Sequence, residues 1–171
     1  MTSKESRLIL QMVVIALGIA GSVLLTSFVF IPLPLGGGFL NFTDVFVIFY
    51  AMFFGPLTGG LVGALSGLMV DIILGYGFYA PFTFAIKLAE GLVVGFLFHK
   101  IKGKLRYIAP FIGGLLMAVL YFLPDYLILQ NFGPVFINLV LNVVQGIVGA
   151  SLGLTLYLII IRTKIRPPNL E

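Results

Sequence analysis

Apolar residues in this chain come in six long runs that carry almost no charge. Only 9% of the 171 residues are charged, against about 25% in an ordinary globular domain. A bilayer core about 30 Å thick takes roughly 20 residues of helix, and lipid offers no partner to free backbone groups. The sequence therefore predicts an all-α integral membrane protein, a single domain over residues 1–171. Its six transmembrane helices are expected at about 8–30, 42–54, 57–74, 82–98, 107–129 and 135–161.

The cationic residues between the runs predict how the chain is oriented. Nine of the ten fall on one side when six crossings are counted: Lys4, Arg7, Lys100, Lys102, Lys104, Arg106, Arg162, Lys164 and Arg166. The connections on the other side, residues 31–41, 75–81 and 130–134, contain no Lys or Arg. Because cytoplasmic loops carry an excess of Lys and Arg, both termini are expected in the cytoplasm. The net charge of +4 then reflects topology rather than nucleic-acid binding.

The tenth cation, Lys87, lies inside an apolar run, and other polar residues are expected at the same depth in the membrane. An ionisable residue within a spanning helix costs at least ~2.5 kcal/mol and usually marks a functional site. Polar stripes at i, i+4 and i+7 recur in the outer halves of the fourth and sixth runs. We expect a small-molecule pocket there, of the usual apolar form with a few convergent polar groups. The expected ligand contacts are Lys87, Asn138, Asn142, Tyr121, Asp125, Glu90, Thr83, Asn41 and Gln145.

Several of these polar residues also have a purely structural alternative. Asp44 can satisfy free N–H groups at the start of a helix, and Asp71 can be a structural carboxylate. Lys87 and Glu90 can neutralise each other at i, i+3, and the asparagines of the sixth run can join neighbouring helices. The sequence leaves these alternatives open.

The first outer connection combines stiff and flexible backbone. Residues 31–41 hold two prolines, which stiffen the chain, and three consecutive glycines, which permit wide backbone excursions. We expect a lid over the pocket, with a passive linker as the alternative. Its expected residues are Pro34, Gly36, Gly37, Gly38 and Leu40.

Small residues recur every fourth position on several runs and predict close helix packing. The third run carries such a stripe from Gly55 to Gly67, and pairs follow at Gly91 and at Gly149. We expect these to pack inside the domain. On the first run, Ala16 and Ala20 have the same spacing, and a partner-facing role competes evenly with internal packing there.

Familiar catalytic and metal-binding motifs are missing from the sequence. It has no G-x-x-x-x-G-K-[ST] phosphate loop, no H-E-x-x-H, no G-x-S-x-G and no cysteine. We therefore expect no enzyme, no cofactor and no metal site. If the protein moves its ligand uphill, the energy must come from a partner or from an ion gradient. In the second case the protein is a carrier that works alone and uses Glu90, Asp125 or Asp71 as proton sites.

Three motifs resemble those of the substrate-binding S components of bacterial energy-coupling factor (ECF) vitamin transporters. They are the pair Ala16-x-x-x-Ala20, the Pro/Gly connection ending in Asn41-Phe-Thr-Asp44, and the run DIILGYGFYAPFTFAIKLAEG from Asp71 to Gly91. The resemblance covers nearly the whole chain. The last run is most similar to the branch holding the riboflavin and the hydroxymethylpyrimidine or pyridoxine S components.

This resemblance implies a function and a set of partners. It implies a vitamin bound near the outer surface of the bacterial cell membrane, under the first loop. It also implies that the Ala-x-x-x-Ala face docks on a transmembrane coupling subunit joined to two cytoplasmic ATPases, and that toppling of the S component releases the vitamin inward. Because the chain is compact, a pyridoxine- or hydroxymethylpyrimidine-like ligand is expected, with riboflavin as the alternative.

Overall fold

The computed structural model describes residues 3–32 and 39–163. Two-residue strands β1 (Ile31–Pro32) and β2 (Phe39–Leu40) pair antiparallel, with Ile31 opposite Leu40. A 3-10 helix, η2 (Gly103–Ile108), precedes the fifth α-helix. The α-helices are α1 (Ser3–Phe28), α2 (Thr43–Phe54), α3 (Pro56–Ile73), α4 (Ala80–Lys100), α5 (Ala109–Leu129) and α6 (Phe132–Arg162). The predicted helical fold is confirmed, with six α-helices among the described residues.

Five of these helices are long and apolar enough to cross a membrane, and α2 is shorter. Its 12 residues extend about 18 Å at 1.5 Å per residue, well below the roughly 30 Å of a bilayer core. The six-helix prediction therefore holds, while a full crossing by α2 stays a prediction.

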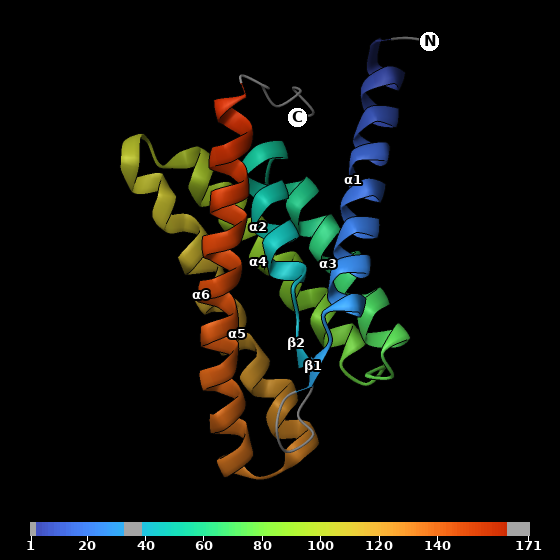
Figure 1. Cartoon of the computed structure of the whole chain (residues 1–171), viewed down its shortest axis with the longest axis vertical. Coiled ribbons are helices and arrows are strands. Elements are labelled where there is room, and N and C mark those ends of the chain that lie inside the picture. Colours follow the sequence, from blue (N-terminus) through green and yellow to red (C-terminus); the bar gives the residue numbers. More distant parts are fainter. Residues whose placement is uncertain (1–2, 33–38, 164–171) are drawn as a thin grey trace.

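The two ends of the bundle differ in charge. Figure 1 places the first turn of α1, the last turn of α6 and η2 at one end, with β1, β2 and the α5–α6 connection toward the other. The described cations Arg7, Arg106 and Arg162 belong to the first of these ends. Among the described side chains, Lys87 is the one buried Lys or Arg. This distribution agrees with the predicted orientation, in which the first end faces the cytoplasm.

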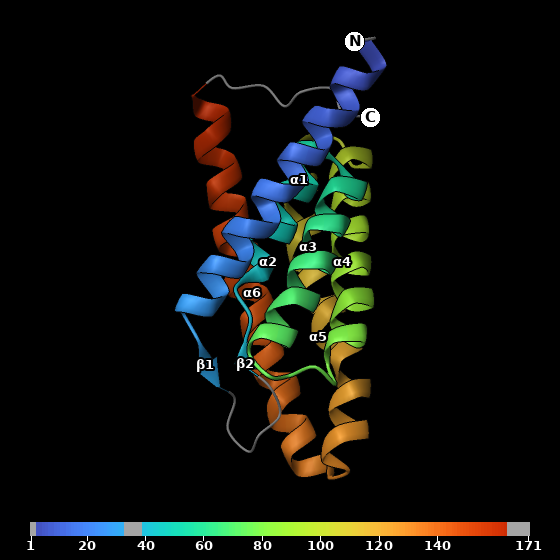
Figure 2. The same cartoon turned by 90° about the vertical axis from the view of Figure 1, so that its right-hand side faces the viewer.

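Helix α1 lies at the edge of the bundle. It crosses α2 and α3 obliquely in Figure 2 and contacts chiefly α3. Only the small or hydroxyl side of the helix is buried, at Gly18, Ser22 and Thr26. Most of its large apolar side chains are exposed, as expected for a surface that meets lipid or another membrane protein.

The tight joint between α2 and α3 depends on its sequence. Gly55 has a φ of 99°, a left-handed conformation that side chains disfavour. Pro56 follows at the first position of α3, where its missing N–H costs nothing. The pair therefore reverses the chain within one residue and brings α2 against α3.

Helices α3 and α4 approach each other through glycine. A Cβ added to Gly91 would lie 2.4 Å from the backbone nitrogen of Gly60 and 2.6 Å from the carbonyl carbon of Gly59. Such a contact is possible only between backbones without side chains, as small-residue stripes in membranes permit.

Gly91→Ala is therefore expected to force α3 and α4 apart and lower the free energy of unfolding by about 1–3 kcal/mol. The shift is measured by thermal unfolding of the purified protein in detergent. Gly77→Ala is the matched control, because a Cβ at Gly77 meets no atom within 4 Å. Equal unfolding temperatures for the two variants would contradict the predicted close contact.

The half of the bundle nearer the chain ends is filled by an apolar core. Buried side chains from α2, α4 and α6 meet there, among them Met52, Val94, Phe98 and Tyr157. The Phe98 and Tyr157 rings lie edge to face with centroids 5.1 Å apart. This packing closes the bundle below the polar half.

Candidate functional site

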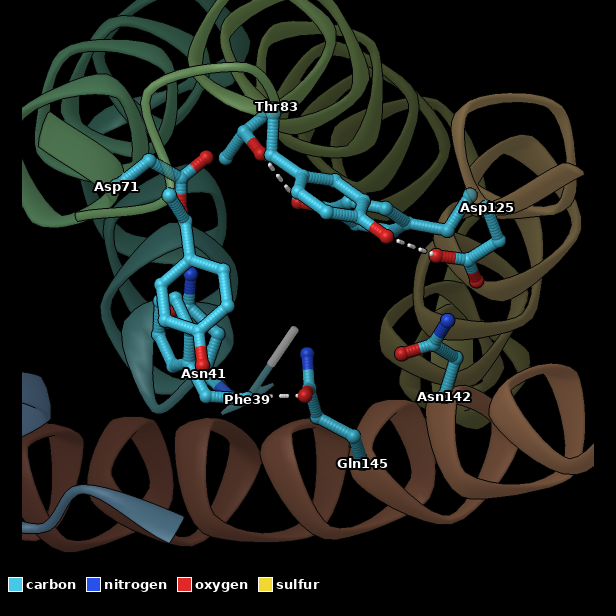
Figure 3. Close-up of a pocket in the computed structure, with 10 residues that line it drawn as sticks. Phe39, Asn41, Asp71, Thr83, Asp125, Asn142 and Gln145 are labelled. Carbon is cyan, nitrogen blue, oxygen red and sulfur yellow. Dashed lines mark hydrogen bonds between the residues drawn. The ribbon is translucent and has the colours of Figure 1, made fainter. Parts of the chain in front are cut away.

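A polar cavity of about 360 Å³ lies in the half of the bundle opposite the chain ends. Five segments supply its wall: β2 with the residues after it, the end of α3, the α3–α4 connection with the start of α4, the end of α5, and the first half of α6. Figure 3 shows these side chains arranged around an open centre. The lining residues are Phe39, Asn41, Asp71, Tyr76, Tyr79, Thr83, Tyr121, Asp125, Asn142 and Gln145.

Six of the nine expected ligand contacts line this cavity, namely Asn41, Thr83, Tyr121, Asp125, Asn142 and Gln145. The other three, Lys87, Glu90 and Asn138, are fully buried and are not among its lining residues. Asn138 lies one helical turn from the lining residue Asn142 on α6. Helical spacing predicted which faces of α4 and α6 carry the lining residues. It did not show where along the helix the cavity ends, because Lys87 and Asn138 are buried one helical turn from the lining residues Thr83 and Asn142.

Four lining residues were not among the expected contacts. The sequence offers two other roles for Asp71, as a structural carboxylate or as a proton site of a carrier that works alone. Tyr79 lies four residues before Thr83, so the same helical spacing would have placed it on this face. Tyr76 belongs to the aromatic-rich outer connection, and nothing in the sequence singles out Phe39.

Tyrosine hydroxyls hold the upper wall of the cavity together. Tyr121 Oη donates to Thr83 Oγ1 at 3.0 Å, which joins α5 to α4. Tyr79 Oη donates to Asp125 Oδ1 at 2.8 Å, which joins the start of α4 to the end of α5. These two contacts fix α4 and α5 to each other beside the opening (Figure 3).

Aromatic rings close the side of the cavity next to the strand pair. Phe39 lies 5.0 Å from Tyr76 and 5.7 Å from Phe30 between ring centroids. Tyr76 and Tyr79 are 6.5 Å apart. Flat rings at these separations give a heterocyclic ligand faces and edges to pack against.

Of the five predicted lid residues, the described structure includes Leu40. Pro34, Gly36, Gly37 and Gly38 lie outside the described residues. Leu40 lines a second, mainly apolar cavity of about 370 Å³, formed with Phe42, Val45, Val144 and Val148. Both cavities share Asn41 and Gln145, which stand between them. The backbone N–H of Asn41 donates to Gln145 Oε1 at 2.8 Å, so a hydrogen bond divides the two spaces.

A charged cluster lies buried beneath the polar cavity. Lys87 pairs with Asp44 and also with Glu90, whose Oε2 is 3.1 Å from Nζ. All three residues have no exposed surface. Gln145 Nε2 donates to the other oxygen of Asp44 at 2.8 Å. The predicted Lys87–Glu90 pair is therefore present, and Asp44 joins it rather than capping its helix with its side chain.

The two small-residue faces of α1 have opposite surroundings. Gly18 packs against Tyr50 and Val62, on the bundle side. Ala16 and Ala20 lie on the exposed side of the same helix. Both alanines are exposed in the described chain, so they do not pack inside the bundle there.

Comparison with known proteins agrees with these observations. A sequence model of the family described as ECF-type riboflavin transporter, S component, matches residues 7–162. A protein of Pyrococcus woesei, described only as an uncharacterized protein in a gap 3' region, is 36% identical over 135 residues. That alignment covers 75% of this chain and 88% of the relative. Because the family match runs from the first turns of α1 to the end of α6, the chain belongs to the family of S components of ECF-type riboflavin transporters.

Proposed function

We propose that the chain binds a water-soluble vitamin or vitamin precursor in the polar cavity and delivers it inward as the S component of an ECF-type importer. Family membership supports the vitamin-transport role. The observation that carries the assignment to this cavity is its lining, in which amides, carboxylates and tyrosines from five segments converge on one cavity. Small-molecule sites have this form.

The chemistry of the cavity favours a small, flat, polar ligand. Tyr76 and Tyr79 offer ring surfaces, while Asn142 and Gln145 offer amide hydrogen bonds. Pyridoxine and hydroxymethylpyrimidine, each a single aromatic ring with polar substituents, match these features best.

Riboflavin is the second candidate, because the matching family is described by that vitamin. Its tricyclic ring and ribityl chain make it longer than a single-ring ligand. The apolar cavity beside the polar one offers additional room if the Asn41–Gln145 hydrogen bond opens. We therefore expect riboflavin to need a rearrangement at these two residues that a single-ring ligand does not.

The exposed side of α1 supports a docking role for Ala16 and Ala20. We propose that a transmembrane coupling subunit packs there, with hydrolysis of ATP left to two cytoplasmic ATPases. The ligand then reaches the cytoplasm when the docked S component topples in the cell membrane. Small residues allow two membrane helices to approach closely, which suits this contact.

Binding is tested by calorimetric titration of the purified chain in lipid nanodiscs with pyridoxine, hydroxymethylpyrimidine and riboflavin. We expect one single-ring ligand to bind most tightly. Asn142→Ala should then lower the affinity for that ligand about 2–10-fold, which is the contribution of one uncharged hydrogen bond. Thr155→Ala, an exposed change on the same helix, is the matched control. Failure of all three vitamins to bind would contradict the proposed function.

Uptake into vesicles separates an S component from a carrier that works alone. Vesicles containing only this chain should not accumulate the ligand under a pH gradient. Vesicles that also contain the coupling subunit and ATPases should accumulate it when ATP is supplied. Accumulation driven by the pH gradient alone would overturn the proposed dependence on partners.

A further inference from the structure

We propose that Asp71 and Asp125 select the charge of the ligand, so that the cavity accepts a neutral or cationic hydrogen-bond donor and rejects the phosphate ester of the same compound. The inference rests on the proposed function, because it concerns the ligand of the same cavity. It adds Asp71 as a specificity-determining residue and defines the chemical class that fits.

Each of the two carboxylates has an oxygen with no protein partner. Asp71 is 2% exposed and Asp125 is 1% exposed, and both line the cavity. Asp71 Oδ2 and Asp125 Oδ2 are buried without a hydrogen bond in the described structure. A buried carboxylate oxygen is costly unless a donor meets it. The two therefore require a ligand that supplies O–H or N–H groups.

The carboxylates face the cavity from different sides. Figure 3 shows Asp71 and Asp125 across the opening from each other, with Thr83 between them on the upper wall. Tyr79 occupies Asp125 Oδ1, so the remaining oxygen of that carboxylate is the one left for a ligand. A fitting ligand thus carries donors at two separated positions. Hydroxymethyl, amino and protonated ring nitrogen groups on a single aromatic ring satisfy this arrangement.

No positive charge lines the described part of the cavity. The ten lining residues include no Lys, Arg or His. Residues 33–38, which lie outside the described structure, contain no charged residue in the sequence. The other outer connections, at 75–81 and 130–134, contain no Lys or Arg either.

The nearest cation is already neutralised. Lys87 is fully buried and paired with both Asp44 and Glu90. Two carboxylates share one ammonium group, so this cluster adds no positive charge to the cavity above it. A phosphate group carries a charge of about −1.5 to −2. In the cavity a phosphate group would face Asp71 and Asp125 with no Lys, Arg or His among the lining residues, and like charges repel one another.

Binding of matched ligand pairs tests the charge preference. Calorimetry with the wild-type chain in nanodiscs compares pyridoxine with pyridoxine 5'-phosphate, and riboflavin with flavin mononucleotide. The phosphate ester of the binding parent should bind at least about 100-fold more weakly. Equal binding of parent and ester would overturn the inference while leaving vitamin binding intact.

Asp71→Asn and Asp125→Asn separate charge from size, because the amide has nearly the shape of the carboxylate. Each should weaken binding of the parent ligand about 10-fold. Each should also lower the ratio of the dissociation constant of the ester to that of the parent about 10-fold. A structural role alone would not change that ratio. Tyr79→Phe, which frees Asp125 Oδ1, is the second variant if Asp125→Asn does not fold, and it should leave the ratio large. Glu5→Gln, an exposed carboxylate on α1, is the control for net charge.

A ratio unchanged in Asp71→Asn and Asp125→Asn would overturn the assignment to these two residues. If none of the vitamins binds, the proposed function fails, and the inference is tested on the small molecule that copurifies with the wild-type chain. Mass spectrometry of the extracted compound should then show a neutral or cationic molecule. An anionic compound would overturn the charge preference.

Discussion

Lys87→Met is expected to lower the free energy of unfolding by about 3–5 kcal/mol, the usual cost of removing one partner from a buried ion pair. Methionine keeps the length of the side chain but leaves Asp44 and Glu90 facing each other without a cation. Both carboxylates are fully buried, and Glu90 Oε1 already has no hydrogen-bond partner in the described structure. The loss is measured by thermal unfolding in detergent and by the folded fraction on size-exclusion chromatography.

Neutralising the whole cluster separates charge from packing. The triple variant Asp44→Asn, Lys87→Met, Glu90→Gln should recover most of the lost stability, because a buried ion cluster is often replaced at little cost by uncharged residues. Lys104→Met, in exposed η2, is the matched control for loss of one positive charge. If Lys87→Met unfolded at the wild-type temperature, the buried cluster would not hold the helices together as described.

Ala16→Trp and Ala20→Trp are expected to abolish uptake while leaving ligand affinity within about twofold of wild type. The indole ring would keep a partner helix from approaching the exposed side of α1. It would not reach the cavity, whose lining residues come from β2, the residue after it, and the helices and connections from α3 to α6. Uptake of labelled ligand into vesicles with the coupling subunit and ATPases is compared with calorimetric binding to the same variants.

Val119→Trp serves as the control for a large ring on a lipid-facing surface, because Val119 is exposed on α5, away from α1. It should support wild-type uptake. Normal uptake by both alanine variants would remove α1 from the proposed docking surface. Loss of both uptake and binding would instead indicate that the tryptophan disturbs the fold.

Hydropathy predicted the helices because bilayer thickness and backbone hydrogen bonding act on each run by itself. The expected run at 82–98 corresponds to α4 at Ala80–Lys100, and the expected run at 107–129 to α5 at Ala109–Leu129. The boundaries moved where local polar contacts decide them. Helix α6 begins at Phe132 rather than 135, since the side chain of Asn131 accepts a hydrogen bond from the N–H of Gly133 at 3.0 Å.

The site was harder to predict because it depends on which helices become neighbours. Helical spacing shows that Lys87 and Glu90 share a face, yet Asp44 is 43 residues from Lys87 and no periodic pattern connects them. Only the packing of α2 against α4 brings the two together. The same packing places Lys87 beneath the cavity instead of in its wall, whereas Asp71 reaches the wall from the end of α3.

The side chain of Gln145 connects Asn41, the residue after β2, to the buried charged cluster. Its amide accepts from the Asn41 backbone on one side and donates to Asp44 on the other. Separating Asn41 from Gln145 breaks a hydrogen bond between buried groups, which costs about 1–3 kcal/mol unless another donor replaces it. A ligand that contacts Gln145 would therefore be linked to the buried charges through one amide, although Asp44, Lys87 and Glu90 do not line the cavity.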